Sequence, residues 1–111
     1  MKKLKEILSS TVGRIVSSVL IICFVLSWFF CFDMYKREFN KFKAYYYIYK
    51  GDKAYKEHNL QEAVNYYEYG IKLHPRHYKA MYNLANIYVA YEDYYSALKN
   101  YEKALEIKPD Y

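Results

Sequence analysis

An uninterrupted apolar run near the N-terminus constrains this chain more than any other feature. Residues 15–32 contain no charged side chain over 18 positions. As an α-helix this run spans about 27 Å, which is close to the thickness of the hydrocarbon core of a bilayer. Its C-terminal end is crowded with aromatic side chains, as is typical at a membrane interface: Trp28, Phe29, Phe30 and Phe32. The run therefore predicts a transmembrane helix over 15–32, preceded by a short basic tail over 1–14.

A cleaved signal peptide is the alternative interpretation of this segment. Lys2, Lys3 and Lys5 would then form its charged start. However, the run is longer than a usual signal core, and bulky Phe-Phe-Cys-Phe precedes Asp33 where a small-x-small cleavage site would be needed. These features favour a retained anchor. Four basic residues lie on each flank, and the α-amine tips the balance toward a cytosolic N-terminus, so we expect the rest of the chain on the non-cytosolic side.

The charge of the chain is concentrated around the apolar run. The whole chain carries a formal charge of +5. Residues 1–43 hold eight basic and three acidic side chains, whereas residues 44–111 hold nine of each. The C-terminal part therefore offers no positive field for nucleic acid, and we exclude nucleic-acid binding despite its many tyrosines.

A 34-residue period organises the C-terminal part. Pro75 and Pro109 are 34 residues apart. The same offset pairs five further positions: Gly51 with Ala85, Ala63 with Ala97, Tyr67 with Tyr101, Ile71 with Leu105, and Leu73 with Ile107. The small residues allow two antiparallel helices to approach closely, the tyrosines fill the space between them, and each proline ends a helix. We therefore expect two helix hairpins, over 44–77 and 78–111.

The period and its landmarks resemble the tetratricopeptide repeat. The second copy is close to the family pattern, with Leu84-Ala85-x-x-Tyr88, then Tyr94-x-x-Ala97, then Tyr101-x-x-Ala104-x-x-x-x-Pro109. The first copy departs from it at Ala54, where the pattern has an aromatic residue, and at Gly70, where it has alanine. We expect these two changes to loosen the packing of the first repeat.

The expected fold is all-α, with a single transmembrane helix followed by two antiparallel hairpins that stack as a short α-solenoid. Residues 33–43 are expected to form a helical stalk between these parts. Because no Gly or Pro lies between Arg14 and Lys50, one helix can run through from the membrane into the first repeat. A kink at Asp33, which would then serve as an N-cap, is the alternative.

No constellation of catalytic or metal-binding residues is apparent. Cys23 and Cys31 both lie in the apolar run, and His58, His74 and His77 have no cysteine or carboxylate at ligand spacing. The segment from His74 to His77 is expected to be the turn between the repeats. We therefore expect no metal, no cofactor, no small-molecule substrate and no enzymatic activity.

The resemblance implies a concave groove that takes an extended peptide or a partner helix. Mapped onto this chain, the groove candidates are Tyr45, Ile48, Asp52 and Tyr55 in the first repeat and Lys79, Tyr82, Asn83 and Asn86 in the second. Some family members hold the C-terminal carboxylate of a partner in a clamp of basic and amide side chains, and Asn83 and Asn86 match two of those amides. Ile48, Asp52 and Tyr82 stand where the clamp needs Lys or Asn, so carboxylate capture is not expected.

The last helix also carries apolar residues at helical spacing. They are Leu98, Tyr101, Leu105 and Ile107. Part of this stripe is expected to stay uncovered and to form an interface, with a second copy or with another helical protein. The sequence thus predicts a membrane-anchored adaptor that recruits or positions a protein partner. The alternative is a structural or assembly subunit of a larger membrane complex, or a self-assembling repeat protein.

Overall fold

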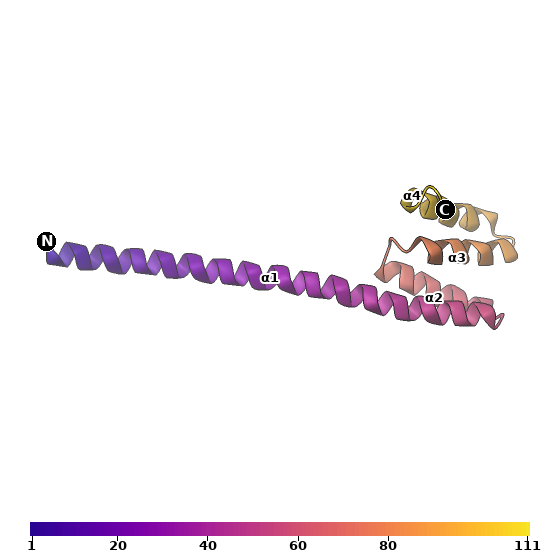
Figure 1. Ribbon diagram of the computed structural model, residues 1–111, viewed down its shortest axis with the longest axis horizontal. Coiled ribbons are helices and arrows are strands. Elements are labelled where there is room, and N and C mark those ends of the chain that lie inside the picture. Colours follow the sequence, from indigo (N-terminus) through magenta and orange to yellow (C-terminus); the bar gives the residue numbers. More distant parts are fainter. The chain divides into compact units, whose positions relative to one another are not determined.

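The computed structural model describes residues 1–111 and is entirely helical. It contains four helices and no strand: α1 (Lys2–Lys56), α2 (Leu60–Leu73), α3 (Tyr78–Ala90) and α4 (Tyr94–Ile107). Figure 1 shows α2, α3 and α4 following one another beside the C-terminal part of α1. The predicted all-α class is confirmed, and the packing of α3 against both α2 and α4 is consistent with a short α-solenoid.

The chain divides into two compact units, Met1–Arg37 and Glu38–Tyr111, which are described separately. Apart from Met1, the first unit lies within α1, and all of its side chains are exposed. It contains the apolar run, which makes α1 long and apolar enough to cross a membrane, although a signal sequence meets the same criterion.

The second unit contains the hydrophobic core. Tyr67 and Ile87 are its largest fully buried side chains. Alanines fill most of the remaining buried positions, including Ala63 from α2 and Ala80 from α3, neither of which has any exposed surface. Because alanine side chains are small, neighbouring helices pack at short distance and the large tyrosine ring fits between them.

The 34-residue period of the sequence reappears in the backbone. The two turns within the hairpins contain His58 and Glu92, both at φ 60°. In the first turn the Asn59 N–H donates to the Ala54 carbonyl, and in the second the Asp93 N–H donates to the Tyr88 carbonyl, each at 2.9 Å. This pattern is the Schellman termination of a helix. The two hairpins are therefore closed by the same turn.

A tyrosine hydrogen bond is also repeated at this offset. The Tyr67 hydroxyl donates to Oδ1 of Asp52 at 2.6 Å, and the Tyr101 hydroxyl donates to Oδ1 of Asn86. Each bond joins the second helix of a hairpin to the first. The acceptor is a carboxylate in the first repeat and an amide in the second, at equivalent positions.

Gly70 corrects one expectation, because the structure does not show loose packing around it. A Cβ atom at Gly70 would lie 2.7 Å from Cγ1 of Ile48 and 3.3 Å from the Ala44 carbonyl oxygen. Ile48 therefore already occupies the space that the family's alanine would fill. At the equivalent position in the second repeat, Tyr82 is exposed and Ala104 fits without such a competitor.

We predict that Gly70→Ala destabilises the C-terminal unit, although alanine is the better helix former by about 1 kcal/mol. The added methyl group overlaps Ile48, and overpacking of this kind costs about 1–3 kcal/mol. Amide hydrogen exchange in α2, measured on the detergent-solubilised chain, should accelerate. Adding Ile48→Ala should cost less in the Gly70→Ala background than alone, because it removes the overlap. Exchange that is unchanged or slower in Gly70→Ala would contradict this account.

We also predict that Tyr67→Phe lowers the free energy of unfolding by about 2 kcal/mol, because it removes a hydrogen bond to a charged acceptor. Burial, followed by the hydrogen bond to Asp52, raises the pKa of Tyr67 above its ordinary value. The unfolded chain therefore loses this proton first, and the stabilisation disappears as the pH rises above about 10.

Denaturation curves recorded at successive alkaline pH values test whether the free energy of unfolding falls as the pH rises. The wild-type chain should lose stability more steeply above pH 10 than Tyr67→Phe does. Tyr101→Phe is the comparison variant. Burial also raises the pKa of Tyr101, but its acceptor is a neutral amide, so this variant should reduce the alkaline slope less than Tyr67→Phe does. A Tyr67→Phe chain with the same alkaline slope as the wild type would show that this hydroxyl does not govern the loss.

Candidate partner-binding groove

A groove lies between the C-terminal part of α1 and the start of α3. Its lining consists of Tyr45, Ile48, Tyr49 and Asp52 from α1, and of His77, Lys79, Ala80 and Asn83 from the other side. Five of the eight sequence-predicted groove residues thus lie together: Tyr45, Ile48, Asp52, Lys79 and Asn83. Ile48 forms part of the core and is buried, whereas Tyr45 and Tyr49 are exposed.

Three predicted groove residues do not line it. Asn86 accepts the hydroxyl of Tyr101 and so belongs to the second hairpin. The Tyr82 ring packs edge-on against Tyr101 and Tyr111, with centroid distances of 5.4 and 5.1 Å. Tyr55 is exposed at the end of α1, beyond the groove lining. These residues are held by their own repeat or lie past the groove.

Three lining residues were missed in the sequence. Tyr49 follows Tyr45 by four positions, so their shared face of α1 could have been recognised from helical spacing. His77 and Ala80 gave no comparable signal. His77 lies at the N-cap of α3, where its Nδ1 accepts the Ala80 N–H at 3.2 Å. The segment from His74 to His77 does form the turn between α2 and α3, as predicted.

Asp52 is the polar centre of the groove. Its Oδ1 accepts the Tyr67 hydroxyl at 2.6 Å and the Asn83 amide at 3.4 Å. Asn83 also approaches the Tyr67 hydroxyl at 3.5 Å. No lysine, arginine or histidine nitrogen forms an ion pair with Asp52; the two ion pairs of the chain are Lys41–Glu38 and Lys53–Glu57.

One end of the groove is aromatic and basic. The rings of Tyr45, His74 and His77 form a triangle with centroid distances of 5.5 to 5.9 Å. Burial, followed by the neighbouring Lys41, lowers the pKa of His74; burial, followed by His74, lowers the pKa of His77. Both imidazoles are therefore neutral at pH 7, which agrees with the acceptor role of His77 at the helix cap.

Charge at this end comes from two exposed cations. A second hollow shares Tyr45, His77 and Lys79 with the groove and is completed by His74, Arg76 and Tyr78. The groove therefore has a carboxylate at its centre, Asp52, and two cations at this end, Lys79 and Arg76.

The four residues of the predicted interface on α4 fall into an exposed pair and a pair that packs within the unit. Leu98 and Leu105 are 58% and 46% exposed. Tyr101 instead points into its hairpin to reach Asn86. Ile107 lines a separate hollow with Ile71 and Met81, toward the first repeat. Only two of the four residues thus lie at the open edge.

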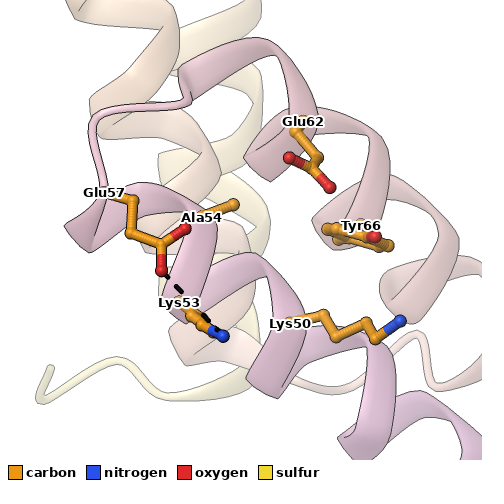
Figure 2. Close-up of a pocket in the computed structure, with 6 residues that line it drawn as sticks. All are labelled: Lys50, Lys53, Ala54, Glu57, Glu62 and Tyr66. Atoms are coloured by element: carbon orange, nitrogen blue, oxygen red, sulfur yellow. Dashed lines mark ion pairs between the residues drawn. The ribbon is translucent and has the colours of Figure 1, made fainter.

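The edge formed by α1 and α2 is charged rather than apolar. Figure 2 shows its hollow, lined by Lys50, Lys53, Ala54, Glu57, Glu62 and Tyr66. The Lys50 ammonium lies 5.5 Å from the centre of the Tyr66 ring, and Lys53 pairs with Glu57 at 4.0 Å. Such a polar outer face is typical of the first unit in a helical repeat stack.

The groove combines aromatic rings with a few polar groups. It is open and lined by aromatic rings, one carboxylate, one amide and one ammonium group. No group of three or more His, Cys, Asp or Glu side chains is placed to hold a metal ion. An open channel with sparse polar groups suits a polypeptide segment, which presents alternating side chains along its length.

Comparison with known families identifies a relative of the second hairpin. Residues 78–111 match the family model described as the tetratricopeptide repeat. No curated protein matches the chain. The match begins at the first residue of α3 and covers both helices of the second hairpin. Residues 78–111 are therefore similar to a tetratricopeptide repeat, and the helical structure of the second unit is consistent with two such repeats.

Proposed function

We propose that this chain is a membrane-anchored adaptor that holds a protein partner in the groove between α1 and α3. The family is a non-catalytic fold that mediates protein–protein interaction, which supports a binding role. One observation carries the proposal: five residues predicted to contact a partner, on two helices, line the same groove. Exposed Tyr45 and Tyr49 supply the large rigid rings that are common at protein interfaces.

The anchor is the second part of the proposal. The apolar run has no protein cover, and a soluble unit rarely exposes so many contiguous large apolar side chains. Basic residues gather on both flanks, as at the ends of a membrane span. The proposal places the repeats on the non-cytosolic side, and protease digestion of sealed cells tests that sidedness.

We predict that the chain stays in the membrane pellet after alkaline carbonate extraction and keeps its intact mass of 13.5 kDa. An uncharged run about as long as the bilayer core is thick partitions stably into lipid. Val19→Arg combined with Leu26→Arg should release the chain, because each charge costs about 3 kcal/mol at the membrane centre. A shortened chain that begins near Asp33 would instead identify the run as a cleaved signal.

Site-specific photocrosslinking tests the groove. We predict that a photoreactive phenylalanine at Tyr49 forms one dominant adduct with a protein in native membranes. The same residue at Glu57, in the charged hollow of Figure 2, should form none. The adduct at position 49 should weaken when Tyr45→Ala removes the other exposed tyrosine ring of the groove. Equal crosslinking from both positions would contradict a role for the groove.

A second candidate function is assembly through α4. Leu98 is 58% exposed, whereas its repeat equivalent Val64, which α3 covers, is 7% exposed. The same face of the second helix is thus buried in one repeat and open in the next. A photoreactive residue at Leu98 separates the two functions, because dominant crosslinks from position 98, with none from position 49, would favour an assembly subunit.

A further inference from the structure

The two repeats differ in charge at one equivalent groove position. Asp52 in the first repeat corresponds to Asn86 in the second, 34 residues later. Both side chains accept a tyrosine hydroxyl from the second helix of their hairpin through Oδ1. Since an amide performs this structural task in the second repeat, the negative charge of Asp52 is not needed for it.

The charge of Asp52 is also left unbalanced within the chain. Both of its hydrogen bonds end on Oδ1, and Oδ2 accepts none. Among the lysines of α1 near Asp52, Lys53 pairs with Glu57 and Lys50 lies over the rings of Tyr46 and Tyr66. Lys56, four residues after Asp52, forms no ion pair with it. Lys79 lies in the same groove but forms no ion pair with Asp52. A half-buried carboxylate without a counter-ion therefore faces the groove.

The groove around Asp52 complements a long basic side chain. Tyr49 lies on the same face of α1, three residues earlier, and 68% of its surface is exposed. Its ring face attracts a cation, and its edge packs against the aliphatic stem of lysine or arginine. Ile48 adds an apolar floor to the same groove. Asp52 then accepts the charged head group through its free oxygen.

We propose that the groove selects a partner segment that carries a lysine or arginine side chain, which Asp52 binds, flanked by apolar or aromatic residues. This inference rests on the proposed function and adds the chemistry of the partner. It differs from carboxylate recognition, because Asp52 would repel a partner carboxylate at the centre of the groove.

Capped peptides test this selection on the full chain in a neutral maltoside detergent. The probes are acetylated and amidated ten-residue peptides that share one Leu and one Tyr and differ only in a central Lys, Arg, Gln or Glu. Fluorescence anisotropy measures their dissociation constants. The Lys and Arg peptides should bind the wild type about fivefold more tightly than the Gln peptide, as expected for a partly exposed ion pair. The Glu peptide should bind most weakly.

Asp52→Asn should bring the Lys and Arg peptides to the affinity of the Gln peptide. The fold should be retained, because Asn86 shows that an amide accepts the tyrosine hydroxyl in this position; circular dichroism checks this. Glu57→Gln is the matched control, since it removes the same charge from outside the groove and should leave all affinities unchanged.

Two outcomes would overturn the inference, and they are distinguishable. In the first outcome, the wild type binds the Lys and Glu peptides equally, or Asp52→Asn keeps the wild-type preference for the Lys peptide. Either result would show that the groove binds peptides but that Asp52 does not select cations. If the wild type binds none of the four peptides at millimolar concentration, both the selection and the proposed groove function are wrong.

Discussion

The close approach of two antiparallel helices around a buried tyrosine is the constraint on which the C-terminal unit depends. Tyr67 occupies the space beside Gly51, where even a single added carbon would lie 2.9 Å from the ring. Its hydroxyl then fixes Asp52 at the surface facing α3. The contact that closes the hairpin thus also orients the central polar side chain of the groove, so packing and recognition share one residue pair.

Much of this arrangement follows from sequence periodicity. The 34-residue offset predicted the two hairpins, because a repeat fixes which helix faces meet. The groove residues were implied by the resemblance to the tetratricopeptide repeat, and five of them line one hollow. The sequence period did not predict packing contacts that depend on side chains from other elements. Tyr82 was assigned to the groove, but Tyr111, whose counterpart in the first repeat is His77, packs on its ring. Gly70 was expected to loosen the hairpin, but a family pattern carries no information about the neighbouring Ile48.

The two outer edges of the unit differ in a way that composition alone does not reveal. The α1 and α2 edge carries paired charges and a cation over a tyrosine ring, whereas α4 presents Leu98 and Leu105. Overall charge in residues 44–111 is balanced, so the asymmetry lies in placement and not in number. The exposed apolar side chains and the paired charges of the unit therefore lie on different helices.

The closing turns have a further consequence for how the chain behaves in a cell. His58 and Glu92 adopt a left-handed backbone without being glycine, which costs about 1 kcal/mol at each turn. Small repeat units have a small free energy of unfolding. A ligand that binds the folded unit therefore raises the fraction of folded chains by mass action. A ligand that binds only the folded unit adds about 2.7 kcal/mol at a hundredfold excess over its dissociation constant. In the proposed adaptor role, copies that hold a partner would therefore outlive unoccupied copies, which would be degraded first.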